Sequence, residues 1–150
     1  MRVYRICAPA HAALDGAGAE QYGGRWNSPG RRMVYTAGHV SLAVVEALVH
    51  VDAATAPLSQ VLLTIDVPDD VRIVRVDAGA LGAGWQTESG IAACRAAGDA
   101  WLAAGRAAVL AVPSAPIPEE TNYLMNPAHV DAARIRVVER RAFSFDERLL

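Results

Sequence analysis

The 150-residue chain contains no lysine, so all 14 of its basic residues are arginines. A phosphate-binding P-loop needs a lysine and is therefore excluded. The formal net charge of −2 argues against a general polyanion binder, because such proteins usually carry a strongly basic face. An RNA-cleaving protein, which commonly uses a basic surface with a His or Lys general base, is disfavoured for the same reasons. Nucleic acid is not expected as a direct partner.

Cysteine is also scarce, with Cys7 and Cys94 the two in the chain. They lack the CxxC or His/Cys spacing that zinc requires, so we expect two buried free thiols and no disulfide. Glu46 and His50 are potential metal ligands at helical spacing, but no third ligand accompanies them and no metal site is predicted. No apolar run approaches ~18 residues and the first residues do not form a signal region, which favours a cytoplasmic protein without a membrane span.

The length and the 53% hydrophobic content predict a single domain over residues 1–150 with a substantial core. Strands are expected over residues 3–8, 33–36, 61–67, 71–76, 109–112, 122–125 and 135–143, helices over 42–50 and from 87 or 89 to 104, and a loop over 14–30. Ser41 and either Thr87 or Ser89 are the expected helix caps, Gly105 ends the second helix, and Pro57 lies beyond the first. Strands and helices do not alternate regularly, so we predict an α+β fold with a mixed, split β-sheet and flanking helices.

The loop Gly23-Gly24-Arg25-Trp26-Asn27-Ser28-Pro29-Gly30 is the first candidate site segment. Glycines let backbone amides approach an anion, and the guanidinium of Arg25 can bind two oxygens in one plane. The motif is weak when taken alone, and a surface salt bridge is the ordinary alternative for Arg25. A long loop that carries such residues favours a functional role.

Glu46 lies on a helix that is apolar around most of its circumference, so we expect this helix to be buried. A buried carboxylate costs several kcal/mol unless it is paired or used. Pairing with His50 four residues later, or with an arginine, is the structural alternative. The functional alternative is that Glu46 belongs to a site.

Three further residues complete the candidate set. Tyr35 ends a strand just before the Glu46 helix, where its ring could stack on a ligand or simply pack in the core. Ser114 follows a buried strand and Pro113; it lacks the Gly-x-Ser-x-Gly elbow of a hydrolase nucleophile, so we expect it to hydrogen-bond a ligand. Asn126 precedes Pro127 and could cap a short helix or support the pocket from below.

The order Arg25, Tyr35, Glu46, followed by Val112-Pro113-Ser114 and by the Asn122–Pro127 segment, resembles the RES domain family. The resemblance extends from Tyr4-Arg5 to His129, nearly the whole chain. It implies a fold like the ADP-ribosyltransferase core of diphtheria toxin. It also implies a bacterial toxin that consumes NAD or transfers ADP-ribose and is paired with an antitoxin carrying a helix-turn-helix domain.

The resemblance implies roles for these residues in NAD cleavage. Glu46 would orient the ribose hydroxyls and stabilise an oxocarbenium-like state, and Tyr35 would stack on nicotinamide. Arg25 and a second arginine, Arg5, would hold the diphosphate. Ser114 and Asn126 would contact or support the ligand, with no metal required. The acceptor (water, phosphate or a protein), the existence of a homo-oligomer, and a non-catalytic nucleotide- or antitoxin-binding role are left open by the sequence.

Overall fold

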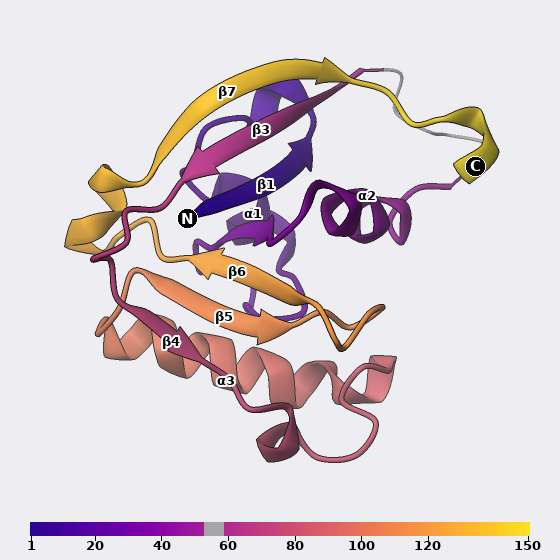
Figure 1. Cartoon of the computed structure of the whole chain (residues 1–150). Helices are drawn as coiled ribbons and strands as arrows, with labels where there is room; N and C mark the ends of the chain where they lie inside the picture. Colours follow the sequence, from indigo (N-terminus) through magenta and orange to yellow (C-terminus); the bar gives the residue numbers. More distant parts are fainter. Residues whose placement is uncertain (53–58) are drawn as a thin grey trace.

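A mixed β-sheet organises the chain, with helices on its faces and margin (Figure 1). The computed structural model describes residues 1–52 and 59–150. Within them, seven strands form one sheet in the order β4-β5-β6-β2-β1-β3-β7, and β4 and β5 are parallel while the other pairs are antiparallel. The strands are β1 (Arg2–Cys7), β2 (Val34–Ala37), β3 (Gln60–Asp66), β4 (Ile73–Arg75), β5 (Val109–Pro113), β6 (Thr121–Met125) and β7 (Arg136–Phe143). The predicted α+β class is confirmed.

The sheet is split between β1 and β2. In the described ladder one residue pair, Tyr4 with Ala37, joins these strands, whereas six pairs join β1 to β3. Figure 1 shows the β7-β3-β1 half and the β6-β5-β4 half diverging, with helix α2 (Val40–Leu48) beside the opening. The predicted split sheet therefore has a defined position, and it leaves space between two central strands.

The core fills both sides of the sheet. Residues 107–112, which include most of β5, are at most 1% exposed, as expected for a strand covered on both faces. Helix α3 (Ile91–Ala104) packs Cys94 and Trp101 against Trp26 and Trp85. Cys7 and Cys94 are both buried free thiols, which confirms the sequence prediction. None of the helices in residues 1–52 and 59–150 is long and apolar enough to cross a membrane.

The predicted loop over residues 14–30 was wrong in one part, because it contains helix α1 (Ala17–Tyr22). Helix α1 is short and contains a glycine, so the intrinsic helix propensity of this segment is low. Tertiary contacts stabilise it instead: the Asn27 amide donates to the Ala19 carbonyl, and Glu20 pairs with Arg32. Such long-range contacts are not visible in a local pattern.

The predicted caps were also wrong. Helix α2 begins after His39 rather than Ser41, and α3 follows Gly90 without a side-chain cap. The Thr87 hydroxyl bonds the Gly84 carbonyl and the Ser89 hydroxyl, so it stabilises the preceding turn. Gly105 does end α3 in a left-handed conformation, with φ of 60°. Pro57 lies outside the described residues.

Helix α2 is less buried than its apolar sequence predicted. Leu42 and Ala43 are buried against the sheet, whereas Val49 just beyond the helix is 57% exposed. The helix lies at the margin of the split, where the sheet covers one side of it. Glu46 is consequently half-buried at an opening rather than enclosed in a core.

Two helical glycines provide a test of how α3 supports the 24–28 loop. A Cβ on Gly98 would stand 1.7 Å from the Trp26 carbonyl oxygen, whereas one on Gly18 would meet its nearest atom at 3.6 Å. We expect Gly98→Ala to lower the free energy of unfolding by about 1–3 kcal/mol through overpacking. Gly18→Ala should instead be neutral or stabilising by up to about 1 kcal/mol. Urea unfolding of both variants checks this, and equal effects would contradict the close packing.

Candidate functional site

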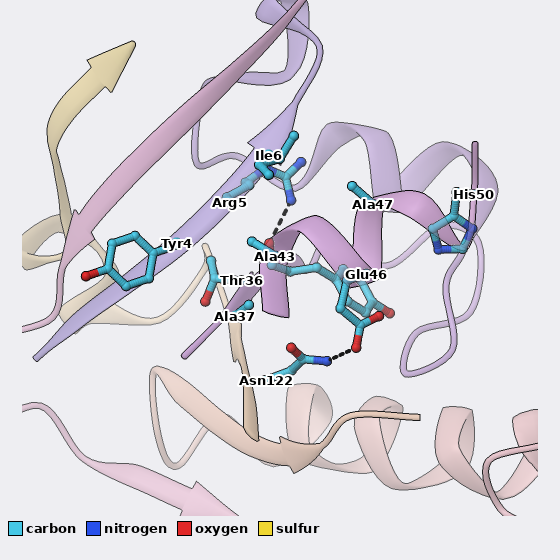
Figure 2. A pocket seen from close by; sticks show the side chains of 11 residues that line it. Tyr4, Arg5, Ile6, Thr36, Ala37, Ala43, Glu46, Ala47, His50 and Asn122 are labelled. Atoms are coloured by element: carbon cyan, nitrogen blue, oxygen red, sulfur yellow. Dashed lines mark hydrogen bonds between the residues drawn. The ribbon is translucent and has the colours of Figure 1, made fainter. Parts of the chain in front are cut away.

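A half-open pocket of about 190 Å³ occupies the split of the sheet. Strands β1, β2 and β6 form its base and helix α2 forms one wall (Figure 2). The lining residues are Tyr4, Arg5, Ile6, Tyr35, Thr36, Ala37, Ala43, Glu46, Ala47, His50 and Asn122. Glu46 is the carboxylate among them, and Arg5 is the guanidinium. The sequence-predicted residues Arg5, Tyr35 and Glu46 therefore meet in one pocket.

Glu46 is held by two donors from the far half of the sheet. Its Oε1 accepts hydrogen bonds from Ser114 Oγ, at 2.7 Å, and from Asn122 Nδ2, at 2.5 Å. Ser114 is fully buried after β5, and its hydroxyl also accepts the Ile117 N–H at 3.2 Å. Two short bonds to one oxygen fix the carboxylate orientation. Ser114 thus contacts Glu46 rather than lining the pocket itself.

Arg5 lies on β1 and reaches across the split. Its Nη1 donates to the Tyr35 carbonyl at 2.9 Å, and Figure 2 draws this hydrogen bond as a dashed line from Arg5. Its buried Nε has no hydrogen-bond partner among the described atoms. A buried N–H on a cation without an acceptor is costly, so the site is suited to an anionic ligand that would supply one.

Tyr35 lines the pocket but is anchored through its hydroxyl. The hydroxyl donates to Asn27 Oδ1 at 2.7 Å and accepts the Trp26 N–H at 3.0 Å. Burial raises the pKa of this hydroxyl well above its usual value. The Asn27 amide in turn binds the carbonyls of Ala19, Ser28 and Arg31. The ring orientation is therefore set by the 24–31 loop.

Arg25 and Asn126 lie apart from the pocket lining. Arg25 donates from Nη1 to the carbonyls of Trp85 and Thr87 and from Nη2 to that of Gln86, at 2.9 to 3.2 Å. Asn126 Oδ1 accepts the Ala128 N–H at 3.0 Å and its backbone N–H bonds the Ala108 carbonyl, so this residue organises the turn after β6. The diphosphate role of Arg25 stays a prediction, and a ligand would have to compete with three carbonyls for this guanidinium.

Several lining residues were not selected from the sequence. Asn122 is the most informative, because it stands opposite Val112 and Ala37 in a buried part of the sheet and bonds Glu46. The sequence signal for Asn122 was its position: it is a polar residue two positions before buried Leu124 on the same strand. In residues 1–52 and 59–150, no three His, Cys, Asp or Glu side chains are grouped closely enough to hold a metal ion.

These features define a class of protein: a small α+β domain whose split sheet presents one anchored carboxylate and one arginine to a half-open pocket. The model of the RES domain family matches residues 2–146. The chain belongs to the RES domain family.

Relatives of this chain carry toxin names. A protein named "Prs ADP-ribosylating toxin" from Sphingobium sp. (strain YBL2) is 41% identical over 139 residues, covering 91% of this chain and 86% of that protein. A "Toxin Res" from Photorhabdus laumondii is 37% identical over 153 residues and covers 100% and 97% of the two chains. A "Toxin Res" from Pseudomonas putida is 38% identical and covers 99% of each.

The fold is also found among solved structures. A chain in the crystal structure of the M. tuberculosis MbcT-MbcA toxin-antitoxin complex superposes with a TM-score of 0.79, at 22% sequence identity, covering 95% of this chain and 84% of that one. At this identity the likeness establishes the fold, and the expected RES-type architecture is confirmed.

The buried Tyr35 hydroxyl generates a pH-dependent prediction. Because its pKa is raised in the folded state, its contribution to stability is complete below the unfolded value of about 10 and is lost as the pH rises above it. Tyr35→Phe leaves the Trp26 N–H and Asn27 Oδ1 without this partner and should cost about 1–3 kcal/mol at pH 8. The difference from wild type should shrink between pH 9 and 11 in urea unfolding. Tyr22→Phe, at a 73% exposed position, is the control, and a constant Tyr35→Phe deficit would contradict the assignment.

Proposed function

We propose that this chain is the toxin of a toxin–antitoxin pair and that it cleaves the bond between nicotinamide and ribose in NAD. The observation that carries the proposal is the Glu46 carboxylate, held by Ser114 and Asn122 at the edge of a pocket that also contains Arg5. The name of the Sphingobium relative, an ADP-ribosylating toxin, supports ADP-ribosyl chemistry, and the name of the Photorhabdus relative supports a toxin role.

The reaction needs negative charge at a defined place. As the glycosidic bond breaks, positive charge develops on the ribose, and a fixed carboxylate stabilises it without reorganising. The two donors hold Glu46 through one oxygen, Oε1. In the proposal, the other oxygen orients a ribose hydroxyl, and the pocket receives the nicotinamide end of the dinucleotide while the adenosine extends outward.

The anionic part of NAD is assigned to the arginines. The buried Nε of Arg5 has no hydrogen-bond partner within the described part of the chain, and a phosphate oxygen would satisfy it. Arg25 remains a second candidate for the diphosphate, provided that ligand entry frees it from the carbonyls of residues 85–87. Tyr35 contributes its ring to the pocket wall from its anchored hydroxyl.

Glu46→Gln is the decisive variant for this proposal. Glutamine keeps an oxygen for Ser114 and Asn122 and should preserve the pocket, but it removes the negative charge. We expect nicotinamide release from NAD to fall by about 10²-fold or more. Glu139→Gln, at an exposed position on β7, should not change the rate. Equal rates for wild type and Glu46→Gln would overturn the proposed role.

The products of wild-type NAD cleavage distinguish the possible acceptors. Free ADP-ribose identifies water, a phosphorylated ADP-ribose identifies inorganic phosphate, and labelled protein from a lysate identifies a protein target. The name of the Sphingobium relative, an ADP-ribosylating toxin, makes protein transfer the second candidate. If wild type binds NAD but releases no nicotinamide under any of these conditions, a non-catalytic binding role is the better account.

An enzyme that drains NAD must be restrained, and we propose a small helix-turn-helix antitoxin as the partner. A carboxylate-bearing segment of this partner would occupy the arginine side of the pocket in place of the diphosphate. Wild-type protein should arrest bacterial growth, co-expression with the antitoxin should restore it, and Glu46→Gln should be harmless alone. The purified complex of Glu46→Gln with the antitoxin should bind NAD at least about 10-fold more weakly than Glu46→Gln alone, as measured by calorimetry. Unchanged affinity would show that the partner acts away from the pocket.

A further inference from the structure

The two polar atoms of the Asn122 side chain differ in their hydrogen bonding. Its Nδ2 donates to Glu46, whereas its buried Oδ1 has no hydrogen-bond partner among the described atoms. An ionised carboxylate only accepts hydrogen bonds, so the amide orientation is fixed: the nitrogen faces Glu46 and the oxygen faces away. Figure 2 shows this oxygen directed away from Glu46, on the side where Thr36 and Ala37 lie.

The unpaired oxygen points to a missing donor. A buried carbonyl without a partner costs about 1–3 kcal/mol, and most such groups are paired by protein, water or ligand. Asn122 lines the pocket, so a ligand there lies close to its amide. The torsion next to a planar amide is soft, so a small rotation of the Asn122 amide toward a ligand costs little.

We propose that Asn122 recognises the carboxamide of nicotinamide, with Oδ1 accepting one carboxamide N–H. The inference rests on the proposed NAD-cleaving function and adds the residue that selects the base. Alanines 37, 43 and 47 leave room for a flat ring beside the amide. Glu46 is already assigned to the ribose. The carboxamide is therefore the hydrogen-bond donor that remains on the nicotinamide end of NAD, which enters the pocket. A pocket that is mostly apolar with a few placed polar groups is typical of such recognition.

This geometry predicts discrimination between an amide and an acid. A nicotinic acid ring would place carboxylate oxygens against Asn122 Oδ1 and near Glu46, where acceptors and like charges repel. The carboxamide instead supplies the donor that the oxygen lacks. We therefore expect wild type to prefer NAD over nicotinic acid adenine dinucleotide by at least about 10-fold in kcat/KM, the value of one hydrogen bond.

The test compares that preference among variants. Asn122→Ala and Asn122→Leu, two variants with different packing but the same polar loss, should reduce the NAD preference by about 10-fold. Ser114→Ala is the matched control, because it also removes one donor to Glu46 but keeps the Asn122 oxygen. Its rates should fall for both dinucleotides while the preference persists. An unchanged preference in a folded Asn122 variant would overturn the proposal, as would an equal loss of preference in Ser114→Ala.

A binding measurement separates this inference from the proposed function. Saturation-transfer NMR with free nicotinamide and nicotinic acid reports base selection in wild type, Asn122→Ala and Asn122→Leu without catalysis, and circular dichroism melting checks that the variants fold. If wild type cleaves no NAD yet selects nicotinamide through Asn122, the inference stands and the enzymatic proposal fails. If NAD is cleaved but neither Asn122 variant alters base selection, the inference fails and the enzymatic proposal stands.

Discussion

The hydrogen bond from Arg5 to the Tyr35 carbonyl is the interaction on which the site depends. In a closed antiparallel sheet, a carbonyl of β2 that faces β1 accepts a backbone N–H from that strand. Here the Arg5 guanidinium donates to the Tyr35 carbonyl instead, and the described ladder between β1 and β2 is reduced to the Tyr4–Ala37 pair. The Tyr35 carbonyl is thus satisfied without closing the split, and the space between the strands remains a pocket.

The two walls of this pocket are stabilised independently. Glu46 is attached to β5 and β6 through Ser114 and Asn122, whereas Tyr35 is attached to the 24–31 loop through its hydroxyl. That loop is held on α3, where the carboxylate of Asp99 binds both the backbone N–H and the hydroxyl of Ser28. A ligand that contacts Arg5 on β1 together with Glu46 or Tyr35 would connect the two halves of the sheet, which one residue pair joins in the described ladder. The hydrogen bonds that hold Glu46 and Tyr35 preorganise the site, and the weak pairing of β1 with β2 keeps it accessible.

The sequence could predict those features that depend on local pattern or on residue type. Apolar runs located the strands, and Gly105 located the end of α3, because these signals are local. The family resemblance helps to indicate Arg5, Tyr35 and Glu46 as site residues, and the structure brings them to one pocket. Helix α1 and the α2 and α3 boundaries could not be predicted, since they depend on contacts with residues distant in sequence.

Arg25 illustrates why residue type alone does not fix a role. The same five donors that suit a diphosphate also suit a row of backbone carbonyls, and the 85–87 turn provides three of them. Arg5 has the same chemistry but a different environment, because β1 holds it at the split, where its Nε–H has no partner among residues 1–52 and 59–150. The free energy available for binding an anion is larger where the guanidinium is buried and incompletely satisfied than where its bonds must first be broken. That difference is why the proposed anion-binding role falls to Arg5 on β1, next to the carboxylate of Glu46 that Ser114 and Asn122 hold in place.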